Sequence, residues 1–596
     1  MSKFIRIFAV IFAVTLLLTS PSSLALAGGF DFEAFEYEHP GWLIVTHPDP
    51  RFRETSAPRM SLLGAADPAL PLYINGEQIP TTPNGFFVYY AALEIGDNVI
   101  HLLNGDNEDY VTITRLAVET GGDDTPWSPT VSEYSSGTFG STEYDNISRF
   151  TDFNDDLYGK TPLVDRTTFA ILGEYDEFYV IGDGTMVFKS NVYMLDRIIP
   201  PIVLSGGAVT PGSNDVSISF EVSDYPLYDI ELQTHGDNTA TLKIFAPSDE
   251  SRLIPDGRYI LTADNYHYTE HFTVNGEPRE IGAIVHELSF GRIPVGYLVE
   301  FKGGVMTVTF KFSPTALSRA VVLLDAGHGG SDPGALGPPA DYGPMEKDFN
   351  LHVARLARDY LVARGVTVVF LRDDDVRIDI MDRIAHFHTQ AEPLPDLVIS
   401  VHSNSMPLTA DFSAVQGPRI YHTLETAEPA ATHMISTIAQ ETGNIFELPI
   451  RRNFAMARYT GGPSMLFEMG FLCNPIEYEK MIEPTYINRL GYSLGMAIEQ
   501  YLTDSAQADI DFRQALYSAD DSEFDETELF DIFDFYQEQL QDYQAIPAMA
   551  TPEAEPTRGP PPLKEALILY IAVMAGVLLV GAVLYLPHAG KLINNE

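Results

Sequence analysis

The 596-residue sequence is poor in cysteine and in basic side chains. Its single cysteine, Cys473, excludes any disulfide within the chain. Lysine and arginine number 36 against 83 aspartates and glutamates, and the formal net charge is −47. That balance argues against nucleic-acid binding and against charge-driven docking on an anionic lipid or polymer. The 45% hydrophobic content is too high for a disordered chain, and the length predicts several domains.

Charged residues are also missing from two apolar runs near the ends of the chain. The first run extends from Ile7 to Leu18, follows Lys3 and Arg6, and is succeeded by Ala25-Leu26-Ala27. A positive start, an apolar stretch and a small-x-small site are typical of a secretory signal peptide. Residues 1–27 are therefore predicted to be a signal peptide.

The second run, residues 566–586, is isolated by prolines on both sides. As a helix rising 1.5 Å per residue it would be about 30 Å long, enough to cross a bilayer. Together the two ends predict a single-pass membrane protein whose folded part lies outside the membrane on the extracytoplasmic side. The acidic, Pro-rich residues 504–562 are predicted to be a linker, and an acidic amphipathic helix that docks on a partner or on its own enzyme is the alternative.

Residues 28 to about 320 have the patterns of small β domains. The turns Asn75-Gly76 and Asn84-Gly85 favour tight hairpins between short apolar runs. With these turns and the string Gly96-Asp97-Asn98, residues 36–117 resemble bacterial immunoglobulin-like modules. Short strand patterns split by glycine turns over residues 125–196 are similar to SH3-like modules, and a generic small barrel is the alternative.

The next region alternates apolar and polar residues, with Val216, Ile218, Phe220 and Val222 on one face. This period of two predicts a β-sandwich, and residues 197–315 resemble an AMIN-like accessory domain.

From Val321 the pattern changes to continuous apolar runs, which predict strands buried on both faces. These runs alternate with segments in which apolar residues recur at helical spacing, as Phe349, Val353 and Leu356 do. Alternating strands and helices predict an α/β domain with an open, mostly parallel sheet over residues 320–503. The expected strands are 321–324, 366–371, 397–401 and 464–467.

Four polar residues lie where an α/β sheet places its sites, near the carboxyl ends of strands. They are His328, Glu346, His402 and Glu468. Two histidines and a carboxylate form a ligand set of catalytic zinc sites, and a second carboxylate can transfer the proton. Histidines after strands are more often structural, so the residues alone leave a purely structural role open.

Longer motifs surround these four residues. Residues 321–502 closely resemble the zinc-dependent N-acetylmuramoyl-L-alanine amidases of the bacterial Amidase_3 family, with matching strings in the family's order and spacing. The strings are Val322-Leu323-Leu324-Asp325-Ala326-Gly327-His328-Gly329-Gly330, Asp332-Pro333-Gly334-Ala335, Glu346-Lys347-Asp348, Ser400-Val401-His402-Ser403-Asn404 and Phe467-Glu468-Met469-Gly470-Phe471-Leu472-Cys473-Asn474.

The resemblance implies His328, Glu346 and His402 as ligands of one Zn²⁺ and Glu468 as the catalytic acid and base. It also suggests that Asn404 positions the substrate. The implied reaction is hydrolysis of the amide between the lactyl group of N-acetylmuramic acid and L-alanine in peptidoglycan. Two alternatives remain: a zinc peptidase that cuts within the stem peptide, and a non-catalytic wall-binding scaffold.

The expected partners follow from this hypothesis. Peptidoglycan would be the substrate, the membrane would hold the C-terminal helix, and nucleic acid is not expected. A cell-wall or divisome-type protein could bind through the β modules or the acidic linker. The expected role is cell-wall remodelling or daughter-cell separation.

Overall fold

The computed structural model describes residues 29–518 with gaps at 118–130, 135–136, 144, 146, 152–159, 234–237, 246–251, 388–392 and 446. The chain divides after Ala519, and every described residue belongs to the first unit. The predicted signal peptide, the predicted membrane helix and most of the predicted linker lie outside the described residues. Within the described part of the chain, no helix has the length and apolar character needed to span a membrane.

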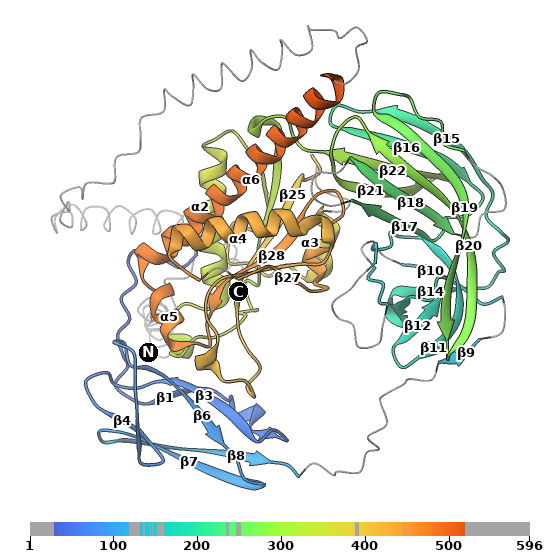
Figure 1. Cartoon of the computed structure of the whole chain (residues 1–596). Helices are drawn as coiled ribbons and strands as arrows, with labels where there is room; N and C mark the ends of the chain where they lie inside the picture. Colours follow the sequence, from blue (N-terminus) through green and yellow to red (C-terminus); the bar gives the residue numbers. More distant parts are fainter. Residues whose placement is uncertain are drawn as a thin grey trace, which may run out of the picture. The chain divides into compact units, whose positions relative to one another are not determined.

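The first β region consists of two sheets, with strand orders β1-β3-β6 and β2-β8-β7-β4-β5 (Figure 1). The Asn75-Gly76 turn joins β4 to β5 as a tight hairpin, as predicted, with both residues at positive φ. The prediction of a hairpin at Asn84-Gly85 is wrong, because β5 and β6, the strands on either side of this turn, belong to different sheets. The strands are β1 (Ile44–His47), β2 (Glu54–Thr55), β3 (Arg59–Ala65), β4 (Leu72–Ile74), β5 (Glu77–Ile79), β6 (Phe86–Ala92), β7 (Gly96–Asn104) and β8 (Asn107–Arg115).

The second β region forms one antiparallel six-stranded sheet, in which β9 pairs with β11 beside the order β13-β12-β11-β10-β14. Its strands are β9 (Ser132–Glu133), β10 (Phe139–Thr142), β11 (Thr168–Tyr175), β12 (Phe178–Ile181), β13 (Met186–Phe188) and β14 (Val192–Leu195).

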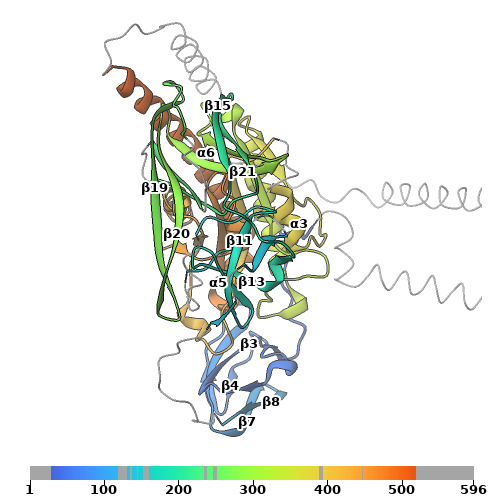
Figure 2. The ribbon, with the colours of Figure 1, turned by 90° about the vertical axis from the view of Figure 1, so that its right-hand side faces the viewer.

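The third β region has two four-stranded sheets, β15-β16-β22-β21 and β17-β18-β20-β19. The predicted alternation in β16 is present, because Val216, Ile218 and Phe220 are all buried. Strands β19 and β20 form one long ribbon (Figure 2). The strands are β15 (Leu204–Pro211), β16 (Asp215–Val222), β17 (Tyr228–Leu232), β18 (Thr239–Phe245), β19 (Ile260–Val274), β20 (Glu277–Phe290), β21 (Pro294–Lys302) and β22 (Val305–Phe312).

The α/β region has the predicted open sheet, with strand order β24-β23-β25-β28-β26-β27. Strands β24, β23, β25 and β28 are parallel, and β26 is antiparallel to β28. The strands are β23 (Val321–Ala326), β24 (Thr367–Phe370), β25 (Leu397–Asn404), β26 (Arg419–His422), β27 (Ile450–Arg451) and β28 (Ser464–Phe471). The helices are α2 (Glu346–Val362), α3 (Ile380–Ala385), α4 (Glu428–Thr442), α5 (Pro475–Met481) and α6 (Pro484–Ser518).

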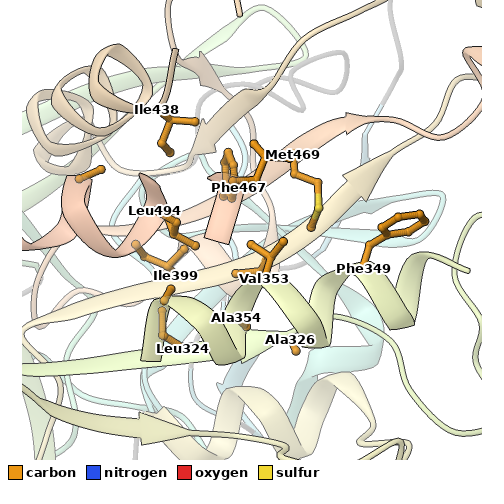
Figure 3. Close-up of a cluster of buried hydrophobic side chains, with 14 of the residues drawn as sticks. Leu324, Ala326, Phe349, Val353, Ala354, Ile399, Ile438, Phe467, Met469 and Leu494 are labelled. Carbon is orange, nitrogen blue, oxygen red and sulfur yellow. The ribbon is translucent and has the colours of Figure 1, made fainter. Parts of the chain in front are cut away.

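One face of this sheet is covered by α2, α4 and α6. Leu324, Ile399 and Phe467 point from three neighbouring strands into a buried cluster with side chains of these helices, such as Val353 and Leu494 (Figure 3). Successive strand residues point to opposite faces. The even-numbered residues of β25 and β28, His402 and Glu468 among them, therefore lie on the other face, whereas His328 follows β23 and Glu346 begins α2.

Helix α6 is longer than its apolar pattern predicts. We expected the linker to begin at residue 504, but α6 continues to Ser518 and takes up the first residues of that segment. The reason is Asp509, which is 1% exposed and accepts hydrogen bonds from Arg292 Nε (2.9 Å) and from the backbone N–H of Ile293 (3.0 Å). The end of α6 is thus anchored on the third β region.

We predict that Arg292→Ala loosens the end of α6. Arg292 also donates to Asn214 Oδ1 (2.8 Å) and to the carbonyl of Ser313 (2.7 Å), so its loss leaves several buried groups unpaired. The free energy needed to open residues 503–518 locally should fall by about 2 kcal/mol, so that their amide hydrogens exchange roughly thirtyfold faster.

The matched control is Arg513→Ala, because Arg513 also contacts Asp509 but is more exposed. Arg513→Ala should change the free energy of this local opening by less than about 1 kcal/mol. Equal exchange rates in the two variants would contradict the anchoring role of Arg292.

Candidate active site

His328 lies in the loop directly after β23, with its backbone at φ 60°. The neighbouring Gly327 makes room for His402, because a Cβ on Gly327 would lie 2.2 Å from Cε1 of His402. Gly334 does the same for Glu346, whose Oε2 would lie 2.5 Å from an added Cβ. These glycines of the matching strings therefore allow the backbone to pass close to two of the candidate site residues, His402 and Glu346.

Glu346 is the first residue of α2 and joins the two histidines. Its Oε1 lies 3.1 Å from Nε2 of His328 and 3.0 Å from Nδ1 of His402. One donor atom from each of the three residues lies within 4.8 Å of the others. Two imidazoles and one carboxylate that converge in this way fit a divalent metal, and the donor types suit Zn²⁺.

Further hydrogen bonds fix the orientation of these donors. Asp332 Oδ2 lies 3.0 Å from Nδ1 of His328, which leaves Nε2 of that ring facing the cluster. Glu346 Oε2 accepts from the backbone N–H of Ala335 (2.7 Å), and Oε1 accepts from that of Ser403 (3.2 Å). A carboxylate behind a histidine ligand is the usual device that orients the ring toward a metal.

The electrostatics of the cluster favour an ionised Glu346. Burial alone would raise the pKa of Glu346, but hydrogen bonds from His328 and His402 outweigh burial and lower it. Burial would lower the pKa of His328, whereas its contacts with Glu346 and Asp332 raise it. The site is thus arranged around one carboxylate that keeps its negative charge, as a metal ligand must.

Glu468 lies within β28 and pairs in register with His402 on β25. Its Oε2 is buried and finds no hydrogen-bond partner among the described residues. Burial, followed by the negative charge of Glu346, raises the pKa of Glu468 well above its usual range. The two carboxyl groups therefore differ in state: one is held ionised, and the other readily accepts a proton.

The structure brings all four predicted site residues together, although two strands extend further than predicted. We expected strands to end at Val401 and Phe467, but they continue to Asn404 and Phe471, so His402 and Glu468 are strand residues. Asn404, the fifth predicted residue, donates from Nδ2 to the hydroxyl of Tyr421 (3.2 Å).

Sequence reasoning missed two residues of this region. Asp332 was part of a matching string without a role, although its place four residues after His328 could have indicated a second carboxylate. Tyr421 on β26 was not singled out at all, because no local pattern indicates that its hydroxyl meets Asn404 across β28.

Two buried arginines support the His328 loop. Arg383 donates to the carbonyls of Ala326 (2.8 Å) and His328 (2.7 Å). Arg372 donates to the carbonyls of Ala326 (2.8 Å) and Gly327 (2.9 Å). These bonds fix the backbone that carries His328.

The matches to known proteins fall on the α/β region. Residues 322–500 match the family model Amidase_3, described as N-acetylmuramoyl-L-alanine amidase. A germination-specific N-acetylmuramoyl-L-alanine amidase of Bacillus subtilis is 29% identical over 204 residues, which cover 32% of this chain and 82% of that protein. The amidase AmiC of Neisseria meningitidis is 25% identical over 231 residues, which cover 31% of this chain and 54% of AmiC.

Solved structures of amidases match the same share of the chain. An N-acetylmuramoyl-L-alanine amidase of Clostridium difficile 630 is 26% identical, with 32% of this chain and 98% of that chain covered and a TM-score of 0.29. The catalytic domain of the amidase CwlV from Bacillus (Paenibacillus) polymyxa is 29% identical, with 31% and 98% covered and a TM-score of 0.27.

We predict that Asp332→Asn weakens Zn²⁺ binding roughly tenfold to a hundredfold, because the carboxylate behind His328 is lost. The affinity is measured by titration against a competing chelator, so the readout does not depend on activity. Asp341→Asn is the control, since Asp341 is an exposed carboxylate of the same connecting segment. His402→Ala should lose the site. An unchanged affinity in Asp332→Asn would show that Asp332 does not support the metal ligand.

Proposed function

We propose that this chain, whose residues 322–500 match the Amidase_3 family, is a zinc-dependent N-acetylmuramoyl-L-alanine amidase. It would hydrolyse the amide between the lactyl group of N-acetylmuramic acid and L-alanine of the peptidoglycan stem peptide. The observation that carries the proposal is the convergence of His328, Glu346 and His402 with Glu468 beside them in register. The family match supports the choice of this amide among the bonds that such a site could cut.

His328, Glu346 and His402 would hold the Zn²⁺ ion. When bound, zinc activates water and polarises the amide carbonyl as a Lewis acid. The protein keeps the three donors in place before the ion arrives: Asp332 orients His328, and two backbone N–H groups orient Glu346. Proton transfer requires a further residue that does not belong to the ligand set.

Glu468 is placed for that work. It takes the proton of the attacking water and returns it to the departing amine of L-alanine. A group that both accepts and donates a proton works best when its pKa lies near the operating pH. The raised pKa of Glu468, caused by burial and by the charge of Glu346, moves it in that direction.

The predicted ends of the chain complete the proposal. A cleaved signal at residues 1–27 and a membrane helix at 566–586 would leave the catalytic region outside the membrane and tethered near the wall. Such a tether suits wall remodelling or cell separation, because a chain of charge −47 gains no electrostatic attraction to an anionic wall. Wall or divisome-type proteins would be contacted by the β regions.

We predict that Glu468→Gln binds Zn²⁺ as the wild type does but loses at least about 10²-fold in turnover, because no group remains to move the proton. Digested peptidoglycan is analysed by mass spectrometry for whole stem peptides with a free L-alanine amine. The matched control is Glu441→Gln, an exposed carboxylate on α4. Near-wild-type turnover in Glu468→Gln would remove the assignment of Glu468.

The same digest separates the other candidate functions. Fragments cut inside the stem peptide would indicate a zinc peptidase. Intact peptidoglycan together with absent stoichiometric zinc would indicate a non-catalytic wall-binding protein.

A further inference from the structure

Three neighbouring strands present a row of functional side chains on the site face of the sheet. His402 on β25 pairs in register with Glu468 on β28, and Glu468 pairs in register with Arg419 on β26. Residues directly opposite each other on adjacent strands point to the same face. The row therefore runs from a candidate metal ligand through the candidate proton carrier to a cation.

A second cation lies near the end of this row. Arg452 directly follows β27, and its backbone N–H donates to the carbonyl of His422 (2.8 Å), at the end of β26. Its guanidinium is half-buried, and no partner for it occurs in the described parts of the chain. The adjacent Arg451 differs, because its guanidinium binds the carboxylate of Glu425 (2.5 Å).

Arg419 is only partly neutralised. Its Nη1 lies 2.5 Å from Oε2 of Glu447, whereas its Nε is buried and has no hydrogen-bond partner among the described residues. Glu468 also faces Arg419 in register, so Arg452 is the cation of this pair for which the described residues supply no carboxylate. This is notable in a chain with more than two acidic residues for each basic one.

Tyr421 connects the two arginines with the site. Its hydroxyl accepts from Asn404, and its ring packs edge-on against Phe454, with centroids 5.3 Å apart. Burial raises the pKa of Tyr421, and the charges of Arg419 and Arg452 oppose this rise. Both cations thus lie within electrostatic reach of the phenol, which itself lies within reach of Glu468.

We propose that Arg419 and Arg452 form a carboxylate-binding subsite beside Glu468, which takes an ionised carboxylate of the stem peptide close to the scissile amide. The proposal rests on the proposed amidase function. N-acetylated sugars carry no ionised group, so the anion must come from the peptide side of the bond. The planar guanidinium matches a carboxylate with paired hydrogen bonds, which makes arginine suited to this recognition.

The subsite predicts a preference for a free carboxylate on the residue that follows L-alanine. The test compares kcat/KM for N-acetylmuramoyl-L-alanyl-D-glutamate with that for the D-isoglutamine analogue, both with the γ-carboxyl blocked as a methylamide, so that an amide replaces the only free carboxylate of that residue. The wild-type full chain should prefer the acid by roughly tenfold or more, because a charge-assisted hydrogen bond is lost with the amide.

Three variants test the residues. In Arg452→Gln the preference for the acid should fall by about tenfold, and Arg452→Lys should retain part of it because the charge remains. Arg451→Gln is the matched control: it removes the neighbouring arginine, which is already paired, and should keep the preference. The subsite is overturned if the wild type shows no preference, or if Arg452→Gln and Arg451→Gln change it equally.

A binding measurement separates this proposal from the proposed function. The γ-methylamides of L-Ala-D-Glu and L-Ala-D-isoGln, which differ only in the α-carboxylate, are titrated into the full chain by calorimetry. Tighter binding of the acid that is lost in Arg452→Gln would support the subsite even without turnover. Equal binding of both peptides would overturn it. Absence of an L-alanine amine product from both substrates would instead count against the amidase function.

Discussion

The register between β25 and β28 is the constraint on which the site depends. It places His402 beside Glu468, and a slip of one residue would turn Glu468 toward the helix-covered face. The register is fixed from that other face, where Ile399 and Phe467 are fully buried under the helices. Hydrophobic packing on one side of the sheet thus determines which polar groups meet on the other side.

The same sheet holds two nearby carboxyl groups in different states. Glu346 is surrounded by donors: two histidine rings and the backbone N–H groups of Ala335 and Ser403. Glu468 is equally enclosed, but its Oε2 has no donor within the described structure. The contrast in their pKa shifts follows from this difference in hydrogen bonding. Two glutamates thus acquire the different properties that the proposed ligand and the proposed proton carrier need, without any difference in residue type.

Much of this could be predicted from the sequence, and the exceptions have a common physical cause. The metal cluster was predictable because its residues lie in local strings that follow strands. Continuous apolar runs also indicated the parallel sheet. The extension of α6 to Ser518, the separate sheets on either side of Gly85 and the place of Tyr421 were not predictable. Each depends on a partner far away in the chain, and no local pattern records such a partner.

Long-range contacts also change how the β regions are to be understood. The segment that follows β25 is held by the first β region: the backbone N–H of Ser61 donates to the carbonyl of Leu408 (2.8 Å), and the hydroxyl of Tyr90 donates to that of Thr409 (2.9 Å). This segment begins directly after Asn404, so its fixed course helps to hold the end of the strand that carries His402. The third β region holds α6 through Arg292. The first and third β regions therefore both brace the α/β region, and these contacts help to hold a candidate metal site that is built on three separate elements in one arrangement.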